Sequence, residues 1–186
     1  GYDVDRRSEA VRRFWEDGEF DSRSNVQFGE GGAGTFSDGK LTTRVNHPLL
    51  RQITQKLVEA GAPKEILYAY NPHIGTDVLR AVVKNLRRKI ERLGGEVRFE
   101  SCLTDLITDE KGSLKAVVVN GNERIETEGL ILGIGHSARD TYRMLYDRKV
   151  YLEKKAFAVG VRIEHDQRVI DRAQYGCDAA DLGLDA

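Results

Sequence analysis

The sequence predicts an α/β fold, on the basis of three patterns in its 186 residues. Residues 76–93 carry apolar side chains at helical spacing, which predicts a long amphipathic helix. Residues 97–119 hold short strand-forming runs that lead to Asn120-Gly121, a dipeptide typical of tight hairpins, and so predict an antiparallel meander. Residues 129–134 are apolar without alternation, as in a parallel strand that is covered on both faces. We therefore expect helices flanking a sheet in three layers.

Further helices and a further strand are expected on either side of these elements. Apolar side chains at helical spacing predict helices over residues 4–17, 48–60 and 139–145, and Thr76 is the expected N-cap of the long helix. Residues 157–163 alternate between large apolar and small or polar side chains. This alternation predicts a half-buried strand at the start of a different layer.

Composition excludes several classes of protein. With net charge −1, there is no general positive field to attract nucleic acid, and no run of about 18 apolar residues is long enough to span a bilayer. Cys102 and Cys177 are far apart and form no metal-binding cluster, which favours a reducing, cytoplasmic setting and no metal site. We expect a first domain over residues 1–150 and the start of a second over residues 151–186.

The segment from Asn25 to Leu41, here called the glycine-rich loop, is the most informative part of the sequence. It contains five glycines between Gly29 and Gly39. Glycines are costly to order, and they are expected where backbone approaches a ligand closely or adopts positive φ. Successive backbone N–H groups in such a loop form a nest that binds anions. The alternative is a flexible linker, although the large apolar side chains of the loop favour burial over a linker.

A phosphate loop is a competing interpretation of part of this segment. Residues 34–40 match most of the pattern G-x-x-x-x-G-K-[ST] that binds the phosphates of nucleotides. The next residue is Leu41, which lacks the hydroxyl that binds magnesium in such proteins. A P-loop-like nucleotide-binding protein and a non-enzymatic interaction module therefore stay as alternatives.

The glycine-rich loop, read as NVQFGEGGAGTFSDGKL, resembles the signature of the uncharacterised FAD-utilising dehydrogenase family. Three other segments are similar to parts of that family in the same order. Residues 2–15 resemble the stretch that follows the second strand of its FAD-binding unit, residues 135–141 resemble its GHSARDT element, and residues 155–165 resemble its next block. The resemblance covers essentially the whole chain.

The resemblance implies an FAD-binding, Rossmann-like three-layer domain over residues 1–150 and the beginning of a substrate domain after it. No G-x-G-x-x-G turn follows a strand in this sequence, so we expect an internal piece that lacks the first βαβ unit. The residues implied to lie along the cofactor are Gly29, Glu30, Gly31, Gly32, Ala33, Gly34, Thr35, Ser37, Asp38, Gly39 and Lys40 in the glycine-rich loop and Gly135, His136 and Ser137 after the buried strand.

The function implied for the parent protein is hydride transfer between FAD and a small organic substrate, with the flavin supplying the chemistry. No catalytic residue is assigned, because capping or packing explains His136 as well as proton transfer does. The chain alone is expected to bind FAD weakly or not at all. A sheet that lacks its first strands would also have an unpaired edge, and such edges favour self-association.

Overall fold

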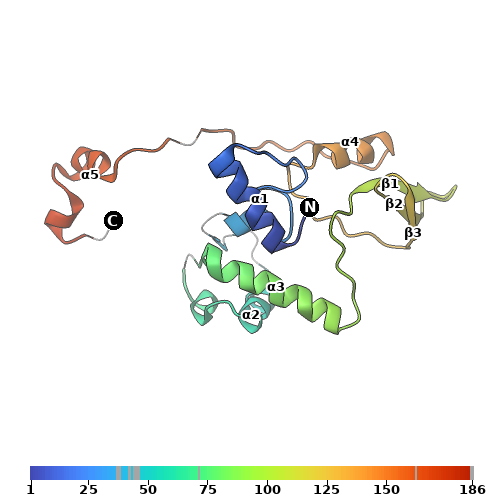
Figure 1. Cartoon of the computed structure of the whole chain (residues 1–186), viewed down its shortest axis with the longest axis horizontal. Coiled ribbons are helices and arrows are strands. Elements are labelled where there is room, and N and C mark those ends of the chain that lie inside the picture. Colours follow the sequence, from blue (N-terminus) through green and yellow to red (C-terminus); the bar gives the residue numbers. More distant parts are fainter. Residues whose placement is uncertain (37–38, 42, 44–46, 71, 162, 185–186) are drawn as a thin grey trace. The chain divides into compact units, whose positions relative to one another are not determined.

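The structure is a computed structural model that describes every residue except 37–38, 42, 44–46, 71, 162 and 185–186. It is a mixed α/β chain with a three-stranded antiparallel sheet (Figure 1). The chain divides into two compact units, Gly1–Val150 and Tyr151–Ala186. None of the helices in the described ranges is long and apolar enough to cross a membrane. Assignment of the two units to an FAD domain and a substrate domain stays a prediction.

The first helix, α1 (Val4–Asp17), confirms the helix that was predicted at the start of the chain. The carboxylate of Asp3 caps its N-terminus by accepting hydrogen bonds from the backbone N–H groups of Asp5 and Arg6 at 3.0 and 3.2 Å. Gly18 ends the helix in the left-handed conformation, with φ of 75°. Local capping chemistry therefore sets both ends of α1.

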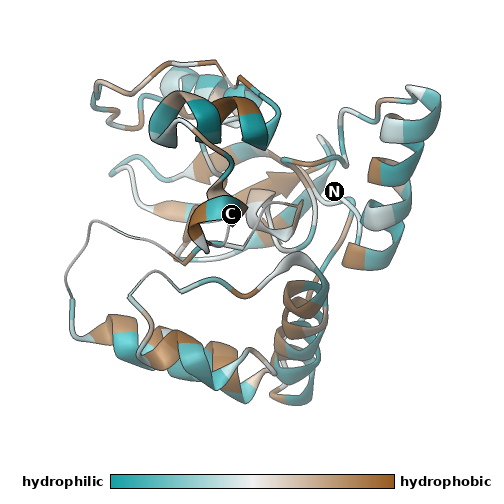
Figure 2. Ribbon diagram, turned by 90° about the vertical axis from the view of Figure 1, so that its left-hand side faces the viewer, coloured by the Kyte–Doolittle hydropathy of each residue, from teal (hydrophilic) through white to brown (hydrophobic). Residues whose placement is uncertain are grey.

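Helices α2 (Leu49–Glu59) and α3 (Thr76–Arg92) form the main apolar core with the 3-10 turn η2 (Lys64–Leu67). Both apolar and polar residues occur along these helices (Figure 2), and the apolar ones recur at the helical spacing that amphipathic packing requires. The N-cap of α3 is Gly75 and not Thr76, which is the first helical residue. The buried core residues are Ala60, Ala62, Ile66, Ile74 and Val82.

The predicted meander is confirmed in strands β1 (Leu103–Thr108), β2 (Leu114–Val119) and β3 (Glu123–Glu126), which pair in that order. Asn120 and Gly121 connect β2 to β3 with φ of 53° and 79°, the positive values that a tight hairpin turn requires. The strand expected within residues 97–99 is absent, since this stretch is irregular.

Helix α4 (Arg139–Asp147) packs on β1 and confirms the helix that was predicted after residue 138. Its apolar side is buried at Leu145, which is 3% exposed. Just beyond its end, the guanidinium of Arg148 forms two hydrogen bonds with the carboxylate of Asp105 on β1. This pair ties the end of the helix to the sheet.

Two strands that the sequence predicted are not formed. Residues 129–134 and 157–163 have no strand pairing in the described chain, and Ile131 and Phe157 are 99% and 82% exposed. The reason is physical: an apolar strand needs neighbours that complete its backbone hydrogen bonds and cover its faces. In the described residues the sheet is an antiparallel meander, so the parallel Rossmann-like layer stays a prediction.

The second unit contains α5 (Gln167–Tyr175) and the 3-10 turn η3 (Ala179–Leu182). Helix α5 was not expected from the sequence, although Asp166 caps its start and Gly176 ends it with φ of 77°. The buried carboxylate of Asp171 accepts hydrogen bonds from the side chain of Gln167 at 2.7 Å and the backbone N–H of Ala179 at 3.3 Å. These bonds hold the two helical turns together.

The core between α2 and α3 provides a test of the fold. Val82 is 0% exposed, so Val82→Ala should lower the free energy of unfolding by about 2 kcal/mol, because it removes two buried methyl groups. Val78→Ala is the matched control on the same helix, since Val78 is 38% exposed and should cost well under half as much. Urea unfolding of the two variants measures this difference, and equal losses would contradict the assigned core.

The pair between Asp105 and Arg148 predicts a dependence of stability on pH. The Arg148 guanidinium holds the pKa of Asp105 below its usual range, chiefly through hydrogen bonding. The carboxylate therefore stabilises the fold above its unfolded pKa of about 3.9, and this contribution is lost as pH falls through the lower folded value. Asp105→Asn should flatten the loss of stability below about pH 4.

Urea midpoints measured between pH 7 and pH 2 check this expectation. Asp147→Asn is the control, because Asp147 lies at the end of α4, next to Arg148, and its carboxylate is 60% exposed. If Asp105→Asn and the wild type lose stability in parallel over the acid range, the proposed role of the pair is wrong.

Candidate functional site

The first part of the glycine-rich loop is an ordered turn. The side-chain oxygen of Asn25 accepts hydrogen bonds from the backbone N–H groups of Gln27 and Phe28 at 2.9 and 3.3 Å. The backbone N–H of Asn25 donates to the carbonyl of Phe28 at 3.0 Å. Asn25 is itself buried. This turn favours an ordered functional loop over the alternative of a flexible linker.

Arg7 of α1 lies against the loop and contacts its main chain. Its Nε donates to the carbonyl of Asn25 at 2.8 Å, and its Nη1 donates to the carbonyls of Glu30 at 2.6 Å and Gly29 at 3.4 Å. Gly29 has φ of 121°, and a Cβ there would lie 2.5 Å from Cδ of Arg7. A glycine is therefore required at position 29 both for backbone conformation and for space.

Glu30 is held inside the fold. Its backbone N–H donates to the carbonyl of Tyr2, and one carboxylate oxygen accepts from the backbone N–H of Val4 at 2.7 Å. The other oxygen lies 3.0 Å from Nε of Arg87 on α3. The side chain was a predicted ligand contact, but it joins the N-terminus of α1 to α3 and is only 8% exposed.

The loop then forms a short 3-10 turn, η1 (Ala33–Phe36). Gly31 has φ of 85°, and a Cβ there would lie 2.1 Å from the hydroxyl oxygen of Thr35. Thr35 is fully buried, and its hydroxyl has no hydrogen-bond partner among the residues that the structure describes. The guanidinium carbons of Arg7 and Arg80 lie 4.8 and 5.3 Å from the ring centre of Phe36. Two cationic side chains therefore share one aromatic ring at the end of the turn.

The last part of the loop runs as an extended segment. Lys40 forms an antiparallel bridge with His73, with bonds from Leu41 N–H to the Pro72 carbonyl at 2.8 Å and from Ile74 N–H to the Gly39 carbonyl at 3.1 Å. A phosphate loop places its lysine at the start of a helix, and an extended bridge at Lys40 argues against that interpretation. The predicted site residues Ser37 and Asp38 lie outside the described residues.

A cavity of about 940 Å³ brings two of the sequence motifs together. This volume is at the upper end of the range of about 300–1,000 Å³ that is usual for sites of small molecules and cofactors. Phe28 and Gly29 from the glycine-rich loop and Ser137 from the segment before α4 all contribute to its wall. The other wall residues are Gly1, Tyr2, Ser22, Arg23, Glu100, Ser101, Cys102, Leu103, Asn120, Ile134, Ala138, Arg139, Asp140 and Thr141.

Of the predicted site residues that the structure describes, Gly29 and Ser137 line this cavity and the others do not. Gly135 has φ of 67°, its carbonyl accepts a hydrogen bond from the hydroxyl of Tyr142, and His136 is exposed. The N-terminus of α4 lies in the wall, and no side chain caps it. The wall also includes Arg23, Arg139, Glu100 and Asp140, so it offers backbone donors together with charges of both signs.

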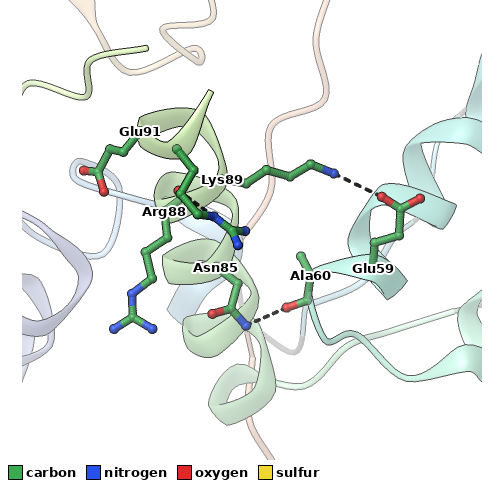
Figure 3. A pocket seen from close by; sticks show the side chains of 7 residues that line it. Glu59, Ala60, Asn85, Arg88, Lys89 and Glu91 are labelled. Carbon is green, nitrogen blue, oxygen red and sulfur yellow. Dashed lines mark hydrogen bonds and ion pairs between the residues drawn. The ribbon is translucent and has the colours of Figure 1, made fainter. Parts of the chain in front are cut away.

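A separate groove of about 670 Å³ lies between α2 and α3, and the described residues that line it include none of the predicted site residues (Figure 3). Across it, Nζ of Lys89 lies 3.1 Å from the carboxylate of Glu59, and the amide of Asn85 donates to the carbonyl of Ala60 at 2.9 Å (Figure 3). These contacts show that the groove is the polar boundary between two packed helices. A surface ion pair and a hydrogen bond cross it.

Comparison with known proteins links the chain to flavin-dependent proteins. Residues 156–186 match the model of a family described as "FAD-dependent protein, C-terminal domain-like". An uncharacterised protein of Clostridium beijerinckii is 56% identical to the chain over 176 residues. The match covers 95% of the chain and 33% of the relative, so the chain spans about a third of that protein's length. The FAD-dependent link rests on the second unit, whereas the cavity lies in the first.

The close approach of Arg7 to Gly29 predicts a strong effect of a single methyl group. Gly29→Ala adds backbone strain of about 1–2 kcal/mol and a clash with Arg7 of about 1–3 kcal/mol. Gly32→Ala is the control in the same loop, because Gly32 also has positive φ but has open space where a Cβ would lie. It should cost only the strain. Urea unfolding measures the difference, and equal costs would show that Arg7 does not fill the space beside Gly29.

Proposed function

We propose that this chain is part of a flavin-dependent oxidoreductase that transfers hydride between FAD and a small organic substrate. The match of residues 156–186 to an FAD-dependent family supports the flavin. The resemblance of the glycine-rich loop and of residues 135–141 to an FAD-utilising dehydrogenase family supports the reaction class. When bound, FAD supplies the hydride chemistry, and the protein binds and orients it.

The observation that carries the proposal is the shared cavity. Gly29 and Ser137 belong to motifs that are far apart in the sequence, yet both line its wall. Two motifs that are far apart in the sequence are therefore both available to contact one ligand. A glycine-lined wall beside an uncapped helix start supplies backbone N–H donors, which suit the phosphates of a dinucleotide.

The cavity wall, and not the buried donors behind it, supplies the groups that suit such a cofactor. In the described part of the chain the Thr35 hydroxyl and Nη2 of Arg7 lack hydrogen-bond partners, but both residues are fully buried and neither lines the cavity. We assign Gly29 and Ser137 to close backbone approach to the cofactor, and the N-terminus of α4 to its anionic part. Gly31 and Gly135 then act through their positive φ, which shapes the segments that they belong to.

The alternatives fit the structure less well. A P-loop-like nucleotide-binding protein needs Lys40 at a helix start, and Lys40 lies in an extended bridge instead. A non-enzymatic interaction module accounts for the exposed apolar residues within 129–134, but it leaves the cavity between the two motifs unexplained.

We also propose that the isolated chain associates with copies of itself. The outer edge of β3 carries charged side chains at Glu123, Arg124 and Glu126, which disfavour pairing there. The exposed apolar residues 130–132 provide a better surface for self-association, because no strand pairs with them in the described chain.

The test of the function is the spectrum of the full-length gene product. It should purify with a flavin absorption band at about 450 nm, or gain one when FAD is added, and anaerobic dithionite should bleach that band. The 186-residue chain alone should bind FAD at least about tenfold more weakly, because it lacks a dinucleotide-binding G-x-G-x-x-G turn. A full-length protein that stays colourless with excess FAD would exclude the proposed function.

A further inference from the structure

Tyr2 lines the cavity of about 940 Å³, and both of its hydrogen-bond donors are used inside the fold. Its hydroxyl donates to a carboxylate oxygen of Asp21 at 2.9 Å, and its backbone N–H donates to the hydroxyl of Ser24 at 3.3 Å. Its carbonyl accepts from the backbone N–H of Glu30 at 3.0 Å. What Tyr2 offers to a ligand in the cavity is therefore the surface of its aromatic ring.

The ring of Tyr2 is held in place from two directions. The guanidinium carbon of Arg6 lies 4.0 Å from the ring centre, which is a cation–π contact with one face of the ring. Nη1 of Arg6 in turn lies 2.9 Å from the carboxylate of Glu100, another residue of the cavity wall. The bond from the hydroxyl to Asp21 fixes the far end of the ring. A side chain that is already fixed loses little conformational freedom when a ligand stacks on it.

The cavity wall combines apolar surface with groups that bind anions. Phe28, Leu103 and Ile134 line the cavity together with Tyr2, and the uncapped N-terminus of α4 lies in the same wall. Ligand sites of this kind use apolar and aromatic side chains for contact area and a few polar groups for orientation. A ligand that suits both kinds of group has a planar ring linked to an anionic part, as a nucleotide has.

We propose that Tyr2 stacks on the adenine ring of a nucleotide in this cavity, with Arg6 on the opposite face of the tyrosine ring. A cation on one face of an aromatic ring draws the π electrons towards itself. The other face then suits an electron-rich ring such as adenine better than the electron-poor isoalloxazine ring. The inference rests on the proposed function, in which the nucleotide is FAD, and it assigns a ring contact to a residue outside the glycine-rich loop.

The test compares FAD with FMN, which lacks the adenine ring, in fluorescence titrations of the full-length gene product. Tyr2→Leu removes the aromatic ring and should weaken FAD binding about tenfold, as expected for the loss of one stacking contact, while FMN affinity stays unchanged. Tyr2→Phe keeps the ring and should keep FAD affinity within about twofold. Tyr68→Leu is the matched control, because Tyr68 is 77% exposed and does not line the cavity. It should leave both affinities unchanged.

The two ligands separate a stacking contact from a structural role. If Tyr2 only anchors the start of α1, Tyr2→Leu lowers the affinities for FAD and FMN by the same factor, and the proposal is overturned. If Tyr2→Leu does not fold, the ring-proton NMR signals of Tyr2 in the wild-type 186-residue chain replace it as the readout. They should move upfield on addition of AMP but not of ribose 5-phosphate, and unmoved signals at the solubility limit of AMP overturn the proposal.

Titration with AMP also separates this inference from the flavin function. AMP binding that Tyr2→Leu weakens, in a full-length protein that never binds FAD, would support the adenine contact and exclude the flavin function. Equal FAD affinity of the wild type and Tyr2→Leu would exclude the adenine contact and leave the flavin function standing.

Discussion

The contact between Arg7 and the main chain of the glycine-rich loop is the interaction on which the first unit depends. It joins α1 to residues 25, 29 and 30 through hydrogen bonds to three carbonyls. Glu30 completes the connection, because its carboxylate meets the start of α1 and Arg87 of α3. Together the two side chains convert a glycine-rich stretch, which has a high entropic cost of ordering, into a defined segment between two helices.

Elements that depend on local chemistry could be predicted from the sequence. Asp3 and Gly18 mark the ends of α1, and Asn120-Gly121 marks the hairpin between β2 and β3. The strands expected over residues 129–134 and 157–163 are not formed in the described chain. A strand depends on pairing partners elsewhere in the sequence, which a local pattern does not reveal. An apolar run indicates side chains that are suited to burial. It does not show whether a neighbouring strand is present to pair with the run and cover it.

The candidate site was also predicted only in part from the sequence. The glycine spacing identified the loop, and the positive φ values of Gly29 and Gly31 agree with the reason for that prediction. Arg7 was not identified, because it lies in a charged helix where an arginine is expected on the solvated face. The signal that was available is positional: Arg7 stands three residues after Val4 on the buried side of α1, and both are 0% exposed.

Burial of Arg7 has a cost that the loop itself partly offsets. A buried charge makes the folded state less favourable than a neutral side chain of similar shape would. The three carbonyl oxygens that accept hydrogen bonds from Arg7 carry partial negative charge, so they lower this cost while they fix the path of the loop. An arginine at this position therefore contributes to the definition of the loop more than to the stability of the fold.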